Sequence, residues 1–360
     1  MTGANPHIAR MSPYALSAMA APDGKRLISL SQNESLRAPS PRAVAAAAGL
    51  LEKAALYPDP DWAELRHALG DLHQIASEGI LCGNGSLDLI GCIARAFAGP
   101  GRAVLAPVHA YPFFRSAAQM VNARFDTAEE IEATVSVDAL LSSVQPDTVL
   151  VFIANPGNPT GTRIPKLELQ RLRAGLREDI LLVIDEAYGE FADHLGETCF
   201  DMVGDGKTVV LRTFSKAYGM AGFRVGWGYF PPLIAAELRK VMNPNNVSSV
   251  GQAAAIAALS DREYMRKTCE QTVALRETAT GNLRAAGFQV FPSHTNFILI
   301  NLGSVRAAES ANAALRAEGV FPRPQDSAGL PSALRMTIAP QSELDAAISR
   351  LVLWKKEYAS

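Results

Sequence analysis

The sequence contains few cysteines and no grouping of metal-binding residues. Its four cysteines, Cys82, Cys92, Cys199 and Cys269, lie far apart, and none belongs to a CxxC pair. In a chain of 360 residues this spacing indicates reduced, buried cysteines of a cytoplasmic protein rather than a disulfide framework. The six histidines do not cluster either, so we expect no structural zinc site and no other metal site.

The sequence also lacks a secretory signal, a membrane span and an excess of one charge. Its first residues show no basic head followed by an apolar stretch, and no apolar run reaches membrane-spanning length. The formal net charge is -2, with no long block of Lys or Arg. These absences argue against nucleic-acid and membrane partners, so we expect the partners to be small molecules.

Five continuous aliphatic runs dominate the middle of the chain. They cover residues 102–106, 148–154, 180–185, 208–211 and 225–230 and are rich in β-branched residues. Such runs are typical of strands buried on both faces, as in a parallel sheet covered by helices. Amphipathic patterns at residues 87–97, 113–119, 166–176 and 233–240 predict helices between them. We therefore expect an α/β fold built from βαβ units.

The pattern changes after about residue 261. A long helical stretch over 261–286 stops at Gly287, and short strands are predicted at 288–291, 296–301, 320–323 and 334–338, with helices near 305–318 and 342–356. This predicts a smaller α+β domain. We expect a large domain over residues 41–260, a small domain over 261–360, and an N-terminal segment, residues 1–40, that packs on the small domain.

Polar motifs follow several of the predicted strands, where open α/β sheets bind ligands. After 148–154 comes the rigid loop NPGNPTG at 155–161, in which Asn158 offers an amide donor. A purely structural turn is the alternative. Strand 180–185 ends in Asp185, with Tyr188 three residues on. A buried carboxylate needs a cationic partner such as a protonated pyridine nitrogen, unless this Asp only caps the next helix.

A lysine among apolar neighbours follows the strand at 208–211. Lys216 comes after Thr213 and Ser215, and Arg224 lies eight residues further on. Burial near a cation lowers the pKa of a lysine and makes its amine nucleophilic, while hydroxyl and guanidinium donors suit a phosphate. A lysine on a helix surface is the alternative, but it explains these donors poorly.

Two glycines precede the predicted helix at 87–97. The segment Gly83-Asn84-Gly85-Ser86 would leave backbone amides at a helix start to hold an anion, although a plain helix-entry turn explains it equally well. Asp88 stands where the third glycine of a dinucleotide-binding motif would be, which argues against a nucleotide-dependent oxidoreductase.

These residues together resemble the fold-type-I pyridoxal-phosphate (PLP) aminotransferases, most closely the histidinol-phosphate aminotransferase family. The match runs from about residue 30 to about residue 339. Its ordered motifs are Asn33-Glu34, YPDP at 57–60, GNGS at 83–86, Tyr111, NPGNPTG at 155–161, DEAY at 185–188, TFSKAYGMAGFR at 213–224 and LRMTI at 334–338.

The resemblance implies the PLP-dependent transferase fold of the aspartate aminotransferase type, with a mostly parallel central sheet in the large domain and a smaller α+β domain. It implies that Lys216 binds PLP as a Schiff base and moves the substrate Cα proton, and that Asp185 pairs with the ring nitrogen. The other cofactor contacts that it implies are Asn158 and Tyr188 on the ring hydroxyl, Tyr111 on the ring face, and Asn84, Gly85, Ser86, Thr213, Ser215 and Arg224 around the phosphate. It further implies a homodimer in which Tyr57 reaches the neighbouring subunit's phosphate.

Substrate contacts are expected from Arg335, which the resemblance assigns to the substrate anion, and from Asn33, Arg323 and Tyr14. For Arg323, a surface arginine ending a strand is the alternative. The sequence departs from the family pattern at Ser35-Leu36 and at Ala339-Pro340, both of which border the substrate. The amino donor therefore stays open among histidinol phosphate and aromatic or other amino acids.

The expected reaction is ping-pong transamination between such an amino compound and a 2-oxo acid. A decarboxylase of the same fold, similar to the threonine-phosphate decarboxylases, would use the same cofactor residues and remains an alternative. A non-catalytic relative would be expected to have lost part of this set. Lys216, Asp185, Asn158, Tyr188 and Arg224 are all present, which argues against that third possibility.

Overall fold

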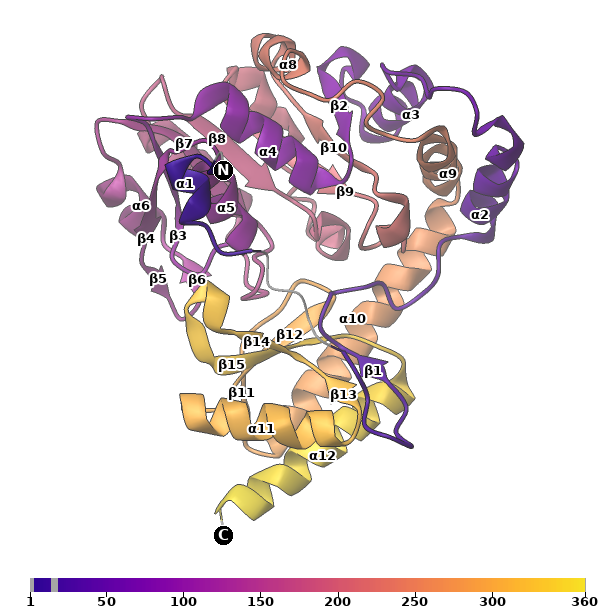
Figure 1. Ribbon diagram of the computed structural model, residues 1–360, viewed down its shortest axis with the longest axis vertical. Helices are drawn as coiled ribbons and strands as arrows, with labels where there is room; N and C mark the ends of the chain where they lie inside the picture. Colours follow the sequence, from indigo (N-terminus) through magenta and orange to yellow (C-terminus); the bar gives the residue numbers. More distant parts are fainter. Residues whose placement is uncertain (1–2, 14–18, 360) are drawn as a thin grey trace.

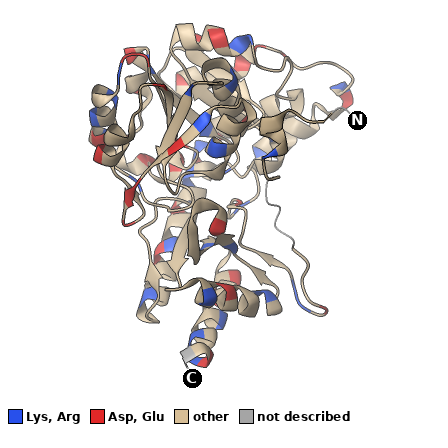
Figure 2. Cartoon of the chain, turned by 60° about the vertical axis from the view of Figure 1, so that its left-hand side comes forward, with Lys and Arg blue, Asp and Glu red and all other residues tan. Residues whose placement is uncertain are grey.

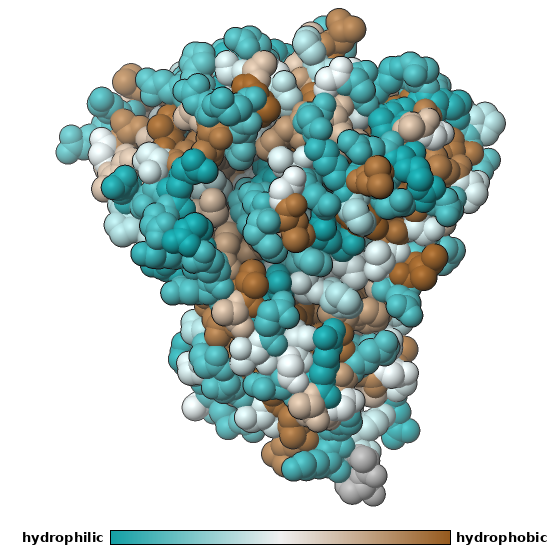
Figure 3. Space-filling model, turned by 180° about the vertical axis from the view of Figure 1, so that it is seen from behind, coloured by the Kyte–Doolittle hydropathy of each residue, from teal (hydrophilic) through white to brown (hydrophobic). Residues whose placement is uncertain are grey.

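The computed structural model describes residues 3–13 and 19–359 (Figure 1). Within these residues the chain forms one seven-stranded sheet, one four-stranded sheet and two short two-stranded pairs. The larger sheet lies in the upper part of Figure 1 and the smaller one in the lower part, where the C-terminus also lies. Space-filling atoms show the same outline from behind, a wide upper part above a narrower lower part (Figure 3).

The large sheet has the order β2-β10-β9-β8-β7-β3-β4. Only β10 runs antiparallel to its neighbours, β2 and β9, so the sheet is mostly parallel as predicted. Its strands are β2 (Ile80–Gly83), β3 (Ala103–Pro107), β4 (Arg124–Ala128), β7 (Thr148–Ala154), β8 (Leu181–Asp185), β9 (Thr208–Thr213) and β10 (Gly226–Tyr229). The aliphatic runs predicted five of them. The prediction missed β2, which has four residues, and β4, an edge strand with partly exposed, polar residues.

Helices connect and cover these strands. They are α1 (Pro6–Ala9), α2 (Pro41–Ala48), α3 (Ala63–His73), α4 (Ser86–Phe97), α5 (Pro112–Met120), α6 (Val137–Ser143), α7 (Lys166–Gly175), α8 (Pro232–Arg239) and α9 (Ser249–Ser260). Helices α2, α6, α9 and α11 (Val305–Ala317) begin after serines whose hydroxyl oxygens accept a backbone N–H in the first turn, namely Ser40, Ser136, Ser248 and Ser304. Helices α4 and α5 pack against each other, and α4 lies in front of the large sheet in Figure 1.

The long helix α10 (Arg262–Ala285) leads into the smaller sheet (Figure 1). Gly287, with φ +79°, follows its end as predicted. The smaller sheet has the order β11-β12-β15-β14 and consists of β11 (Gln289–Val290), β12 (Phe297–Asn301), β14 (Arg323–Gln325) and β15 (Leu330–Thr337), all antiparallel. Helices α11 and α12 (Gln341–Ala359) pack together beside it.

Shorter elements complete the fold. Strand β1 (Ile28–Ser29) pairs in parallel with β13 (Val320–Phe321), and β5 (Glu130–Ile131) pairs with β6 (Thr134–Val135). The 3-10 turns are η1 (Leu51–Lys53), η2 (Ser77–Gly79), η3 (Gly189–Phe191), η4 (Asp193–Leu195), η5 (Phe200–Asp205), η6 (Ala221–Phe223) and η7 (Asp326–Ala328).

Buried apolar residues form two clusters. The larger one lies around the seven-stranded sheet, and the smaller one joins the second sheet with α10, α11 and α12. The N-terminal segment contacts both parts of the chain. Leu30 belongs to the smaller cluster and β1 pairs with β13, whereas α1 lies against α5 of the larger part.

The surface is mixed in charge and polarity. Lys and Arg alternate with Asp and Glu along the outer elements (Figure 2), and exposed apolar residues form separate patches among hydrophilic ones (Figure 3). Among the helices of the described residues, none is long and apolar enough to cross a membrane.

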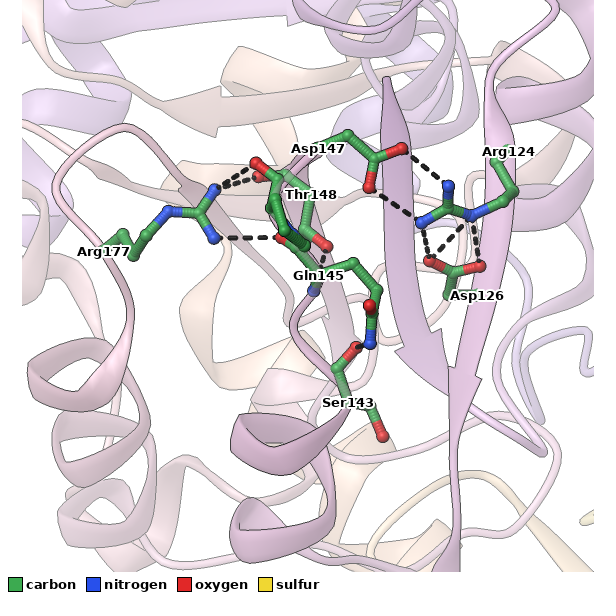
Figure 4. A network of polar contacts seen from close by, with 8 residues as sticks. Arg124, Asp126, Ser143, Gln145, Asp147, Thr148 and Arg177 are labelled. Carbon is green, nitrogen blue, oxygen red and sulfur yellow. Dashed lines mark hydrogen bonds and ion pairs between the residues drawn. The ribbon is translucent and has the colours of Figure 1, made fainter. Parts of the chain in front are cut away.

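Two arginines connect the amino end of β7 to those of β4 and β8 (Figure 4). Arg124 forms ion pairs with Asp126 at 2.8 Å and Asp147 at 2.6 Å. Arg177 forms an ion pair with Asp179 at 3.0 Å and also donates to backbone carbonyl oxygens at 2.9–3.1 Å, those of Gln145, Pro146 and Thr148. Because this end of the sheet is opposite the carboxyl ends of the strands, the contacts serve the fold.

We expect Arg177→Ala to lower the free energy of unfolding by about 1–3 kcal/mol, because a charged donor to several carbonyl groups is lost. Arg124→Ala is the matched control, and it should cost less than Arg177→Ala, because exposed ion pairs contribute little to stability. Urea unfolding of both variants measures the difference. A larger loss from Arg124→Ala would show that the ion pairs, rather than the carbonyl contacts, stabilise this end of the sheet.

Candidate active site

Most of the predicted site residues that the structure describes meet at one edge of the large sheet. The parallel strands β2, β7, β8 and β9 end there, and the antiparallel β10 begins there, directly after Arg224. In register, Asp185 lies beside Ala154 on β7, and Gly226 lies between Gly83 and Thr213. A cleft of about 790 Å³ opens at this edge. Its lining includes Asn33, Ser86, Tyr111, Asn158, Asp185, Tyr188, Thr213, Ser215, Lys216, Arg224, Arg323 and Arg335.

Lys216 follows β9 and extends into the cleft. Its Nζ donates to the backbone oxygens of Asn33 at 2.9 Å and Gln32 at 3.2 Å. Burial, together with the nearby cations Arg335 and Arg224, lowers the pKa of Lys216 to about 7. A substantial fraction of this amine is therefore neutral, and able to act as a nucleophile or a base, at neutral pH.

Asp185 at the end of β8 is 5% exposed. One carboxylate oxygen accepts the backbone N–H of Ala187 at 3.0 Å. Burial, reinforced by the charge of Glu186, raises the pKa of Asp185 to about 7. A cation that carries an N–H would stabilise this carboxylate in its charged form.

Hydroxyl and guanidinium donors gather beside the start of α4. Thr213 Oγ1 lies 3.0 Å from Ser215 Oγ, and Arg224 Nη1 lies 3.4 Å from the same oxygen. Arg224 Nη2 donates to the backbone oxygen of Asn84 at 3.4 Å. This places a guanidinium and two hydroxyls next to the N-terminus of a 12-residue helix that begins at Ser86, a combination suited to a phosphate.

Two glycines allow this close approach. A Cβ on Gly85, whose φ is +82°, would lie 2.3 Å from Arg224 Nη2, and a Cβ on Gly226 would lie 2.1 Å from the Ser86 nitrogen. Neither distance can be accommodated without displacing the neighbouring group. The backbone of the helix start, the guanidinium and strand β10 therefore fit together only because both positions are glycine.

A second polar group lies on the other side of the cleft. Arg335 on β15 donates to Asn158 Oδ1 at 2.7 Å and to the Ser31 backbone oxygen at 2.6 Å, and its guanidinium lies 5.2 Å from the Phe297 ring centre. Arg323 on β14 is directly opposite Arg335 in the strand register. Both arginines line the cleft, so an anion bound there can meet two guanidinium groups.

The remaining predicted residues take different positions. Tyr111 precedes α5 and lines the cleft, with its ring 5.7 Å from that of Phe114 in an edge-to-face contact. Asn33 lines the cleft, and its Nδ2 donates to the Tyr188 hydroxyl at 2.8 Å. Tyr57 lies outside the cleft lining and is 88% exposed. Tyr14 lies outside the described residues.

Sequence reasoning missed several residues of the cleft. Arg115 and Gln119 line it from α5, and their spacing of four and eight residues from Tyr111 was a signal that could have found them. The carbonyl groups of Ser31 and Gln32 had no such signal, because every residue carries a backbone oxygen. In the part of the chain that the structure describes, no group of three or more His, Cys, Asp or Glu side chains could hold a metal ion.

Comparison with known proteins gives one consistent result. The family described as aminotransferase class I and II matches residues 25–351. Histidinol-phosphate aminotransferase of Rhodospirillum centenum is 39% identical over 356 residues, 98% of each chain. A histidinol-phosphate aminotransferase of Sinorhizobium meliloti, solved in complex with pyridoxal-5'-phosphate, has a TM-score of 0.91 at 27% identity and 99% coverage of both chains.

A more distant structure shares the fold. The aspartate aminotransferase of Thermus thermophilus, solved with maleate, has a TM-score of 0.83 at 20% identity and covers 98% of this chain. The predicted aspartate-aminotransferase type of fold is thereby confirmed, as is the resemblance drawn from the motifs. The chain belongs to the class I and II aminotransferases, the PLP-dependent enzymes of fold type I, and is similar over nearly its whole length to their histidinol-phosphate aminotransferases.

Proposed function

We propose that this protein is a PLP-dependent aminotransferase that exchanges an amino group between histidinol phosphate, or a related small amino compound, and a 2-oxo acid. The observation that carries this proposal is the pairing of Lys216 and Asp185 in one cleft, an amine and a carboxyl group that both have a pKa of about 7. The family match and the histidinol-phosphate aminotransferase relatives support it. None of these findings favours the decarboxylase alternative.

The residues at the site fit the cofactor. Asp185 would hold the ring nitrogen, because a protonated pyridine supplies the N–H cation that its buried carboxylate needs. Asn158 and Tyr188 would hold the ring hydroxyl oxygen, and Tyr111 the ring face. The phosphate would lie among the donors at the start of α4, namely Asn84, Gly85, Ser86, Thr213, Ser215 and Arg224.

When bound, PLP joins its aldehyde carbon to an amine and withdraws electrons from the carbon next to that amine. Lys216 would hold the cofactor and would move the substrate Cα proton as base and then as acid. Its lowered pKa suits both roles near neutral pH. Asp185 would supply a negative charge to the ring nitrogen.

Arg335 and Arg323 would bind the anionic group of the substrate. Their opposed positions on β15 and β14 allow both to contact a phosphate or a carboxylate. The same pair can serve the amino donor and the 2-oxo acid in turn, because each carries one such group. Histidinol phosphate is favoured by relatives of 36–39% identity, while Ser35 and Ala339 mark where the sequence departs from the family.

A homodimer belongs to this proposal. Tyr57 is 88% exposed, and Val44, Leu51 and Leu56 are exposed apolar residues nearby in sequence. A second copy packed on this segment would cover them and bring Tyr57 to the neighbouring phosphate. A cytoplasmic location is also proposed, because the four cysteines, all within the described residues, are buried and unpaired.

The test is an absorbance spectrum of the purified protein, recorded before and after adding histidinol phosphate, glutamate or phenylalanine. The expected result is a yellow protein whose band changes to that of the amine form with one donor, together with formation of the matching oxo product. Release of carbon dioxide without an oxo product would instead establish the decarboxylase. A protein that stays colourless with added PLP would contradict the proposal.

The phosphate site gives a further prediction. Gly85→Ala should weaken PLP binding at least about 10-fold, because the added Cβ displaces Arg224 and because alanine is strained at φ +82°. Gly91→Ala, in the interior of α4, is the matched control, since its Cβ would meet Arg95 at an ordinary 3.5 Å. Titration of the apo-proteins with PLP measures both. Equal affinities in the two variants would show that PLP does not contact this helix start.

A further inference from the structure

Asn33 and Tyr188 form a largely buried polar pair in the wall of the cleft. Asn33 Nδ2 donates to the Tyr188 hydroxyl oxygen at 2.8 Å, and the two residues are 1% and 3% exposed. Buried polar groups are nearly always hydrogen-bonded, and the loss of such a bond is costly.

The direction of this bond determines the role of the tyrosine. A phenol carries one hydrogen and accepts through its lone pairs. Because the Asn33 amide donates, the Tyr188 oxygen acts as an acceptor on that side, and its hydrogen must be directed elsewhere. Tyr188 lines the cleft, so the amide favours donation by the hydroxyl into the cleft.

The Asn33 amide is held in place by its own backbone. Asn33 has φ +53°, a left-handed conformation that asparagine tolerates better than most residues. Its N–H donates to Thr337 Oγ1 at 3.0 Å, and its carbonyl oxygen accepts from Asn296 Nδ2 at 3.1 Å and from Lys216 Nζ at 2.9 Å. Residues of the smaller part of the chain thus fix the loop that contacts both Tyr188 and Lys216.

We infer that Asn33 is a positioning residue that directs the Tyr188 hydroxyl as a hydrogen-bond donor to the ring oxygen of PLP. This inference rests on the proposed function. A donor stabilises the negative charge of that oxygen and weakens its hold on the proton shared with the Lys216 nitrogen. Loss of that proton changes the absorbance of the holoenzyme without substrate. The pH midpoint of this change should therefore be lower when the Tyr188 hydroxyl donates than when it does not.

The experiment is a pH titration of the absorbance of the PLP-loaded protein without substrate. Asn33→Gly removes the amide and accepts the left-handed backbone, so it should raise the midpoint by about 0.4 to 1 pH unit, the effect of one hydrogen bond. Asn33→Asp has the same shape, but its carboxylate accepts the Tyr188 hydrogen. It should raise the midpoint further in the same direction.

A double-mutant cycle separates this role from a general loss of structure. Tyr188→Phe should raise the midpoint by itself, and adding Asn33→Gly should then cause no additional shift. Ser35→Ala is the matched control, because it removes a hydroxyl from the same loop, one that accepts the Arg37 backbone N–H at 3.5 Å, and leaves the Asn33 amide on Tyr188. It should leave the midpoint unchanged.

Two results would overturn the inference: an unchanged midpoint in both Asn33 variants, or an equal shift from Asn33→Gly with and without the Tyr188 hydroxyl. Either would leave the proposed function intact, since the wild-type protein would still show a titrating cofactor band. A wild-type protein without such a band would overturn the proposed function and this inference together.

Discussion

Replacing Lys216 by alanine is expected to lower the transamination rate about 10⁴-fold or more. The structure offers a physical reason, because this amine combines a pKa of about 7 with a position in the same cleft as Asp185, Tyr188 and Arg335. Loss of a general acid–base group alone costs about 10²–10⁴-fold. Loss of covalent attachment to the cofactor adds to that effect.

The measurement is steady-state transamination together with borohydride reduction of the PLP-loaded protein. Reduction should fix the cofactor to wild-type protein and not to Lys216→Ala. Lys240→Ala is a suitable control, because Lys240 is exposed and pairs with Glu237 on the same helix. Should Lys216→Ala retain more than about a tenth of wild-type activity, another base must move the proton and the role of Lys216 would be wrong.

The sequence was sufficient to predict the part of the fold that carries the site. Long aliphatic runs predicted β7, β8 and β9, and the chemically distinctive residues follow directly after them, at Asn158, Asp185 and Lys216. Elements with weaker patterns were missed. Helix α9, with the sequence SVGQAAAIAALS, is apolar nearly all round, and β4 is a partly polar edge strand, so neither shows a clear period.

Within the site, the sequence predicts which residues lie close together better than it predicts where their side chains point. The motif containing Asn33 was expected to contact the substrate, and the residue does border the cleft, yet its amide is bonded to Tyr188. Its left-handed backbone and its contacts with Thr337 and Asn296 come from residues some 300 positions away in the chain. The opposition of Arg323 and Arg335 likewise depends on the register of β14 and β15, which no local pattern specifies.

The pKa values of Asp185 and Lys216 approach each other from opposite directions for one reason. Burial disfavours the charged form of each group, so it raises the pKa of Asp185 from 3.8 to about 7 and lowers that of Lys216 from 10.5 to about 7. Both groups therefore oppose folding of the apo-protein when they are charged. A bound cofactor would compensate by giving Asp185 a cationic partner and Lys216 a covalent one.

The second large effect is expected from Asp185→Asn, which should stabilise the apo-protein and impair the enzyme. Between about pH 4 and pH 7 the folded state holds a proton on Asp185 that the unfolded state has lost. The Asp185 contribution to the free energy of unfolding therefore falls as pH rises through this window. The asparagine variant has no such loss, so its free energy of unfolding should exceed that of the wild-type protein. This advantage should grow between about pH 4 and pH 7 and stay level above pH 7, at up to roughly 4 kcal/mol.

Thermal unfolding of wild-type and Asp185→Asn apo-proteins over a pH series measures this advantage, with Asp138→Asn as the control because Asp138 is largely exposed. With PLP bound, the advantage should shrink or reverse, because asparagine cannot pair with a protonated ring nitrogen, and transamination should fall about 10²–10³-fold. An advantage that is the same at every pH would mean that folding does not raise the pKa of Asp185. A variant that keeps full activity would show that its carboxylate does not serve the cofactor.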